Sequence, residues 1–156
     1  MTITETFALV SFSIFSYADL RYRLVPGIEV FLFGTILLTL PATPLQTGII
    51  LLACGWSIFR NLSGWYTLPL LFYPPVWPVL LTGYGYRKDI IGRADLLALS
   101  GLACLFPLPA VLLSLFGLEL WRRFWVRRRH GDIPALPGLL IGLIAYLLLR
   151  LFLLTP

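Results

Sequence analysis

The chain has 156 residues, of which 59% are hydrophobic and only 12% are charged, and its formal net charge at pH 7 is +5. Soluble domains carry about 25% charged residues. The composition therefore excludes a water-soluble monomer, a disordered tail and a nucleic-acid-binding module, and it indicates an integral membrane protein. The length allows about six tilted helical spans joined by short loops. We predict an all-α, polytopic membrane protein in which residues 1–156 form a single membrane-embedded domain.

The basic residues lie beside apolar runs, as positively charged cytoplasmic loops do. The first apolar run ends at residue 18 and is followed by Arg21 and Arg23. We therefore expect these arginines in the cytoplasm and the N-terminus outside. The first six residues contain Glu5 but no lysine or arginine, and no small-residue cleavage site follows them. A retained first span is expected rather than a removable signal peptide.

Uncharged runs divide the rest of the chain and cover residues 30–59, 61–86, 96–118 and 133–149. If Arg23, Lys88 and Arg129 all lie in the cytoplasm, an even number of crossings separates each pair. Two helices, at about 93–108 and 110–126, fit between Lys88 and Arg129, and a last span follows Arg129.

Two arrangements satisfy this parity between Arg23 and Lys88. In the first, helices at 27–41 and 45–60 cross, and residues 65–86 form a re-entrant hairpin. In the second, residues 43–62 stay outside and 65–86 cross. A straight helix over residues 65–86 is unfavourable, because each proline removes a backbone hydrogen-bond donor. The segment contains Pro69, Pro74, Pro75 and Pro78. The first arrangement is favoured, and both give six spans.

The two cysteines, Cys54 and Cys104, lie inside apolar runs without CxxC spacing. We expect buried thiols rather than a disulfide or a metal site. His130 has no second histidine or cysteine at ligand spacing, so a loop residue is expected there. We therefore predict no metal and no cofactor.

Two acidic residues stand at one predicted depth on different helices. Asp19 closes the first helix and Asp95 begins the helix at 93–108, both on the cytoplasmic side. Two carboxylates that meet across a bundle can share a proton, so that one acts as a base on water and the other as an acid. That is the minimum apparatus for hydrolysing a peptide bond without a metal. The alternative is that both are interfacial charges paired with Arg21 and Arg93.

The residues around the first aspartate carry a family motif. Asp19 is followed by Arg21 two residues on and by Pro26 seven residues on. The run resembles the first signature of type IV prepilin peptidases and archaeal preflagellin peptidases. That signature usually closes with Pro-Asn, whereas Gly27 stands in the asparagine position here.

The residues around the second aspartate resemble the second signature of the same family. Gly92, Arg93, Ala94 and Asp95 form the G-x-x-D version of the motif that names the GxGD membrane aspartyl proteases. The family usually has a lysine two residues after the aspartate, and Leu97 replaces it. Asp89 is the nearest rival to Asp95, but it lacks the glycine context.

A third landmark lies near the C-terminus, where Pro134 and Pro137 are similar to the proline pair that begins the family's last helix. The resemblance implies an enzyme that cuts the short basic leader from prepilin-like or preflagellin-like membrane proteins at the cytoplasmic boundary, with Asp19 and Asp95 as the catalytic pair. Seven residues would support substrate binding or the site: Arg21, Pro26, Gly92, Arg93, Ala94, Pro134 and Pro137. Because the chain has no CxxC motif, the methyl transfer and zinc site of bifunctional members are not expected.

The expected location is the plasma membrane, with several spans and an active site that faces the cytoplasm. The expected partners are the membrane substrates and the lipid bilayer, without nucleic acid. The basic cluster at 122–129, with Trp121 and Trp125, is interpreted as an interfacial anchor on anionic lipid. Two competing functions stay open: a non-enzymatic membrane scaffold or small transporter subunit, and a GxGD protease with other membrane substrates.

Overall fold

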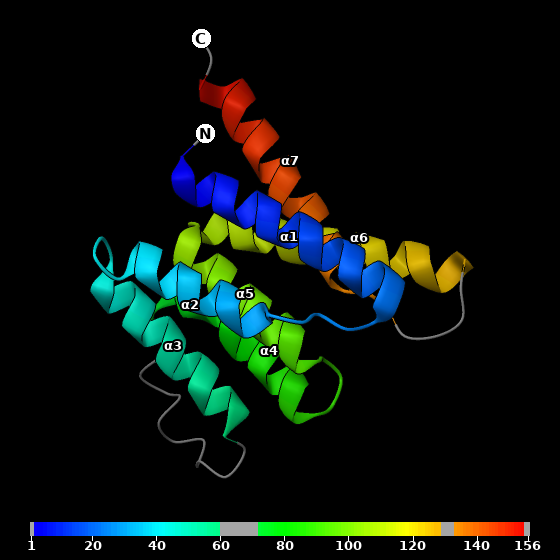
Figure 1. Cartoon of the computed structure of the whole chain (residues 1–156), viewed down its shortest axis with the longest axis horizontal. Coiled ribbons are helices and arrows are strands. Elements are labelled where there is room, and N and C mark those ends of the chain that lie inside the picture. Colours follow the sequence, from blue (N-terminus) through cyan, green and yellow to red (C-terminus); the bar gives the residue numbers. More distant parts are fainter. Residues whose placement is uncertain (1, 60–71, 129–132, 155–156) are drawn as a thin grey trace. The chain divides into compact units, whose positions relative to one another are not determined.

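The computed structural model describes residues 2–59, 72–128 and 133–154. These residues form α-helices and one 3-10 helix, without a strand in the described ranges, which confirms the all-α prediction (Figure 1). In chain order the elements are α1 (Ile3–Tyr22), α2 (Ile28–Thr39), α3 (Pro44–Ile58), η3 (Pro74–Val76), α4 (Trp77–Arg87), α5 (Arg93–Leu105), α6 (Leu108–Arg128) and α7 (Leu136–Leu154). The helices group into two compact units: Met1–Pro26 with Pro109–Pro156, and Gly27–Leu108. The single-domain organisation stays a prediction.

Prolines set several helix boundaries in these apolar runs. Pro44, Pro109 and Pro137 each lie in the first turn of a helix, where the missing N–H has no intrahelical partner to lose. Phe106 precedes Pro107 and adopts an extended backbone, with φ −128° and ψ 154°, so α5 ends at Leu105. A residue before proline disfavours the helical region, which explains this termination.

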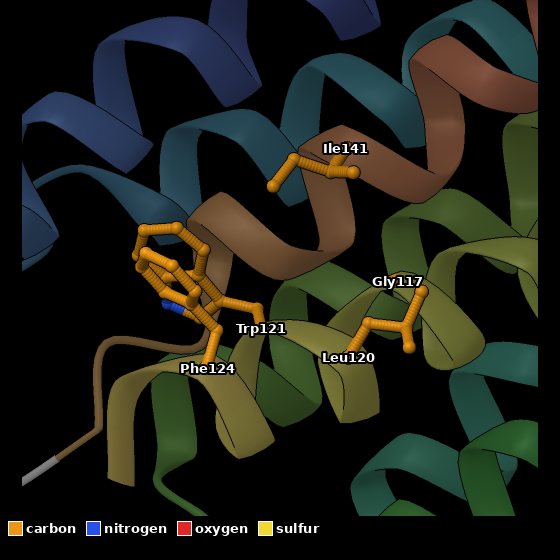
Figure 2. A pocket seen from close by; sticks show the side chains of 5 residues that line it. All are labelled: Gly117, Leu120, Trp121, Phe124 and Ile141. Carbon is orange, nitrogen blue, oxygen red and sulfur yellow. The ribbon is translucent and has the colours of Figure 1, made fainter. Parts of the chain in front are cut away.

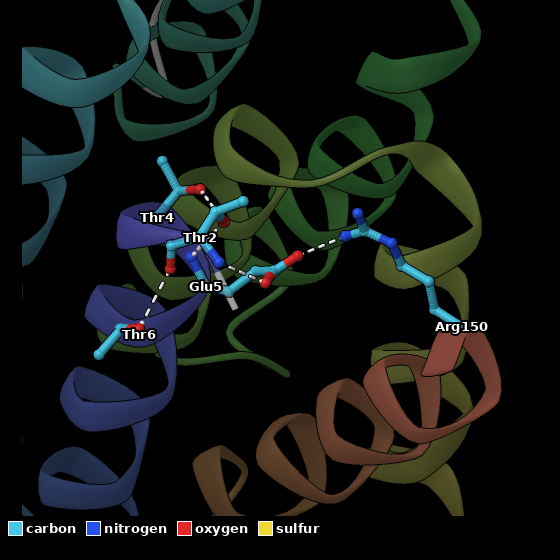
Figure 3. Close-up of polar contacts among 5 residues, drawn as sticks. All are labelled: Thr2, Thr4, Glu5, Thr6 and Arg150. Atoms are coloured by element: carbon cyan, nitrogen blue, oxygen red, sulfur yellow. Dashed lines mark hydrogen bonds and ion pairs between the residues drawn. The ribbon is translucent and has the colours of Figure 1, made fainter. Parts of the chain in front are cut away.

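In the first unit, α1 and α7 pack against each other in opposite directions. A carboxylate oxygen of Asp19 accepts a hydrogen bond from the backbone N–H of Leu136, at the start of α7. Near the other end, Arg150 forms an ion pair with Glu5 (Figure 3). Fourteen residues separate the two contact points on each helix. At 1.5 Å per residue this is about 21 Å along both axes, so the two polar contacts match one antiparallel register.

Glycines bring α6 and α7 into backbone contact. A Cβ added to Gly142 would lie 2.1 Å from the carbonyl oxygen of Leu113, and one added to Gly138 would lie 2.6 Å from the Cα of Leu118. A Cβ on Gly117 would lie 2.6 Å from the carbonyl oxygen of Gly138. The small-xxx-small spacing of Gly138 and Gly142 is typical of membrane helices, whose association depends on close van der Waals packing.

In the second unit, α5 packs against α2, α3 and α4. Arg93 at the start of α5 lies 3.3 Å from Glu29 at the start of α2, so these helices run in the same direction. Gln46 at the start of α3 donates a hydrogen bond to the carbonyl of Ala103 near the end of α5, so α3 runs the opposite way. Ile50 on α3 and several α5 side chains, including Leu96, are fully buried in this core.

The fourth helix follows the direction of the third (Figure 1). Arg87, the last residue of α4, donates to the carbonyl of Trp56 near the end of α3 at 2.8 Å. A Cβ added to Gly83 would lie 2.0 Å from the Oγ of Ser57, so the glycine permits this close packing. The ends of α3 and α4 therefore lie at the same side of the unit.

Among the described residues, α7 alone has both the length and the apolarity of a membrane span, over Leu136–Leu153. The helices α2, α3, α4 and α5 have 12, 15, 11 and 13 residues. A straight span needs about 20 residues. Of the predicted re-entrant segment, residues 65–71 lie outside the described ranges, and the rest contains η3 and α4. Membrane association is thus supported, and six spans stay a prediction.

The close contact at Gly142 between α6 and α7 predicts that a methyl group added there lowers the stability of the protein. Gly142→Ala should destabilise the protein by about 1–3 kcal/mol, because backbone atoms that cannot rotate away surround the position. Gly48→Ala, in α3, is the matched control, since a Cβ there meets nothing within 4 Å. Thermal unfolding in detergent should separate the two variants, and equal stability would contradict the contact.

Candidate functional site

Asp19 lies in the last turn of α1, half-buried. Its Oδ2 atom accepts a hydrogen bond of 3.1 Å from the backbone N–H of Leu136. Leu136 is the first residue of α7, and the N–H groups of a first helical turn have no acceptor within their own helix. The partial positive charge of a helix N-terminus also favours a carboxylate there. Asp19 therefore serves α7 as an N-terminal acceptor supplied by another helix.

The two prolines of the third landmark surround this contact. Pro134 and Pro137 are both buried, and Pro137 occupies the first turn of α7. The carbonyl of Pro134 accepts a hydrogen bond of 2.8 Å from the indole N–H of Trp121 on α6. Two of the three sequence landmarks, which lie more than a hundred residues apart, thus meet at one point of the first unit.

Asp95 is the third residue of α5 and is half-buried. Its Oδ2 accepts a hydrogen bond of 3.3 Å from the backbone N–H of Gly92, the residue that precedes α5. Gly92 has φ −74°, an ordinary value for any residue, and a Cβ there would lie 3.4 Å from Asp95 Oδ2. The backbone does not demand glycine, and a Cβ there would meet no other atom of the described residues within 4 Å. Ala94, between them, is half-exposed.

The arginines next to the two aspartates have partners of their own. Arg93 forms an ion pair with Glu29, and both side chains are 59% exposed. Arg21 donates a hydrogen bond to the hydroxyl of Tyr17, and its guanidinium lies over the rings of Tyr17 and Tyr22. Exposed pairs of this kind contribute little stability. Arg21 therefore contacts Tyr17 and Tyr22, and Arg93 contacts Glu29, so each arginine has a partner other than the nearby aspartate.

The end of the first motif is a turn. Pro26 is exposed, and Gly27 precedes α2 with φ +79°. Glycine adopts this left-handed conformation without steric cost, and asparagine is among the few other residues that tolerate it. The turn connects the chain of the first unit to α2.

The Asp19 carboxylate thus contacts the start of α7 and the Asp95 carboxylate the start of α5, where backbone N–H groups are available as donors. Asp19 belongs to the first unit and Asp95 to the second, so their pairing stays a prediction. Cys54 and Cys104 are free and buried, as predicted. In the described ranges no cluster of three or more His, Cys, Asp or Glu side chains is arranged to hold a metal ion.

Sequence reasoning missed the ion pair between Glu5 and Arg150. Glu5 is only 7% exposed and also accepts a hydrogen bond of 2.7 Å from the backbone N–H of Thr2 (Figure 3). The equal spacing from Glu5 to Asp19 and from Leu136 to Arg150 was visible in the sequence. It becomes informative only when α1 and α7 are known to pack together.

Comparison of the chain with models of protein families, with curated proteins and with solved structures finds no match.

The contact between Asp19 and Leu136 predicts different stabilities for two variants. Asp19→Ala removes the acceptor and should cost about 1 kcal/mol, the usual loss for a deleted N-terminal cap. Asp19→Asn keeps a side-chain carbonyl at the same place and should cost less than half of that. Chemical unfolding in detergent measures both, and equal losses would contradict the capping role.

Proposed function

We propose that the chain is a membrane aspartyl endopeptidase of the prepilin and preflagellin peptidase type, which removes a short basic leader from its membrane substrates. The observation that carries the proposal is the hydrogen bond between Asp19 and Leu136. It joins the first and third landmarks of the resemblance, although nothing in their separate patterns requires them to be neighbours. Asp95 stands in the second landmark with its own backbone contact to Gly92.

The depth of Asp19 also fits such a substrate. The candidate span of α7 begins at Leu136, so the Asp19 carboxylate lies at the end of an apolar segment. A basic leader stays in water while the apolar helix behind it stays in lipid. The bond to be cut then lies at the membrane boundary, which is the level of Asp19.

Charge distribution in the first unit supports an active site on the cytoplasmic side. Exposed arginines lie at the end of α1 and at the end of α6: Arg21, Arg23, Arg122, Arg123 and Arg127. Arg23 lies over the ring of Trp125, at 4.9 Å, which joins the two groups. At the opposite end, Arg150 is paired with Glu5. By the positive-inside rule, the end that holds Asp19 faces the cytoplasm.

The second unit supports the first of the two predicted arrangements. Helices α2 and α5 begin at the same side of the unit, and α3 runs in the opposite direction. These directions fit one membrane crossing by each of the three helices. The core position of α3 argues against its lying outside the membrane. The 11 residues of α4 extend about 16 Å, half of a bilayer core, and end beside the end of α3. We infer six spans, α1, α2, α3, α5, α6 and α7, with α4 as one limb of a re-entrant segment.

One departure from the family pattern has a physical explanation. The family usually has asparagine after the proline of the first motif, and the chain has Gly27 with φ +79°. Glycine and asparagine are the two residue types that adopt this backbone most readily. The substitution therefore preserves the turn after Asp19.

The mechanism we propose uses the Asp19 and Asp95 carboxyl groups with one shared proton. The ionised carboxylate removes a proton from a water molecule, whose oxygen attacks the carbonyl carbon of the scissile peptide bond. The protonated partner gives its proton to the leaving amine as the carbon–nitrogen bond breaks. The proton taken from water restores the starting state, so no cofactor is required.

A second candidate, a non-enzymatic scaffold, is favoured by a specific observation. Asp19 and Asp95 each accept a hydrogen bond from a backbone N–H at the start of a helix. Carboxylates in that position stabilise helices without any catalysis. The two candidates differ in what an asparagine does, because it keeps the acceptor and cannot take a proton from water.

A cleavage assay with Asp19→Asn and Asp95→Asn separates the two functions. Membranes that contain the wild type should cut a prepilin-like reporter, and each variant should lose at least about a hundredfold in rate at equal expression. Asp89→Asn should keep most of the activity, and chelators should have no effect. Full cleavage by either asparagine variant would refute the pair, and a silent wild type across a panel of leader-bearing substrates would favour the scaffold.

A second variant tests access to Asp95. Gly92→Ala should fold, because φ is ordinary and the new methyl group meets only Asp95 Oδ2 at 3.4 Å. The methyl group should lower the rate of cleavage about tenfold, since it occupies space beside the reacting carboxylate. Gly55→Ala, with nothing within 4 Å, is the matched control. Equal rates for the two variants would contradict an approach of substrate from the Gly92 side.

A further inference from the structure

We propose that the first unit has a binding site for one anionic phospholipid, in a groove between α6 and α7 that is lined by Gly117, Leu120, Trp121, Phe124 and Ile141 (Figure 2). We call it the α6–α7 groove. It depends on the membrane insertion proposed above, but not on peptidase activity.

The shape of the groove follows from its residues. The groove runs beside the contact between α6 and α7, where the α7 backbone lies 2.6 Å from the position that a Cβ on Gly117 would take. Leu120 is 51% exposed, Phe124 44% and Ile141 46%, so their apolar surfaces are open to the surroundings. The volume is about 240 Å³, below the roughly 300 Å³ at which most small-molecule pockets begin. An open, wholly apolar channel of that size suits part of an acyl chain better than a compact polar ligand.

The depth of the groove is fixed by α7. Trp121 donates its indole N–H to the carbonyl of Pro134, just before the candidate span begins at Leu136. Gly117 contacts Gly138 and Gly142, inside that span. The groove therefore begins at the boundary and extends into the hydrocarbon layer, as an acyl chain does. Tryptophan is enriched at this level in membrane proteins.

Charge complementarity selects an anionic headgroup. Leu120, Phe124 and Arg127 follow one another at helical spacing along one side of α6, and Arg127 is exposed. Arg122 and Arg123 both donate to Glu119, which offsets part of their charge. Because the Arg127 side chain is exposed, its guanidinium can reach a phosphate at the level of the headgroups.

The test uses phospholipids that carry bromine on their acyl chains and quench tryptophan fluorescence on contact. Brominated phosphatidylglycerol and phosphatidylcholine with the same chains are titrated into purified full-length protein in detergent. The chain has five tryptophans, and all of them can be quenched. The part of the quenching that disappears in Trp121→Phe therefore reports binding in the groove. We expect this component to respond to phosphatidylglycerol at about fivefold lower concentration than to phosphatidylcholine.

Two charge variants locate the headgroup. Arg127→Gln should remove most of the preference for phosphatidylglycerol, and Lys88→Gln, an exposed lysine of the second unit, should keep it. Asp19→Asn should bind lipid as the wild type does, so that failure of the peptidase proposal does not affect this result. Equal quenching by both lipids, or no component that depends on Trp121, would overturn the site. Displacement of both lipids by an apolar helical peptide, with no preference between them, would assign the groove to a protein partner instead.

Discussion

The first unit depends on the axial register of α1 against α7. Glu5 and Asp19 lie fourteen residues apart, and their partners Arg150 and Leu136 have the same separation on the opposite helix. Bringing the next residue of α1 to either contact point would require that helix to turn by about 100° and would separate both pairs. Glu5, which is only 7% exposed, would then lose its ion-pair partner Arg150. The two polar contacts therefore select one register in an interface of mostly apolar side chains.

Glycine packing and polar contacts have different roles in this unit. Apolar side chains gain little by meeting each other in lipid, because lipid tails are equally apolar. Backbone contact at Gly117, Gly138 and Gly142 supplies close van der Waals packing and fixes the spacing of α6 and α7. The position of Leu136 is thus fixed from two sides, by α6 through glycine and by α1 through Asp19. The α6–α7 groove lies beside this glycine contact.

Structural and catalytic roles for the aspartates are compatible. A catalytic carboxylate must be held in place by its surroundings, and a backbone N–H is a rigid donor for that purpose. Asp19 is held by the start of α7, and Asp95 by the N–H of Gly92. Helix capping gives each carboxylate a fixed position, and Gly92 places no side chain beside Asp95. Capping alone would explain the acidic residues, but it requires no particular residue at position 92.

The sequence by itself determined the all-α class and the buried thiols, because long apolar runs act locally. It did not reveal that Asp19 would cap α7, that Arg93 would pair with Glu29, or that Glu5 would meet Arg150. Each of these contacts joins residues on different helices, and helical periodicity says which side of a helix is apolar but not which helix covers it. Local patterns thus identified the candidate residues, whereas their partners were decided by the tertiary packing.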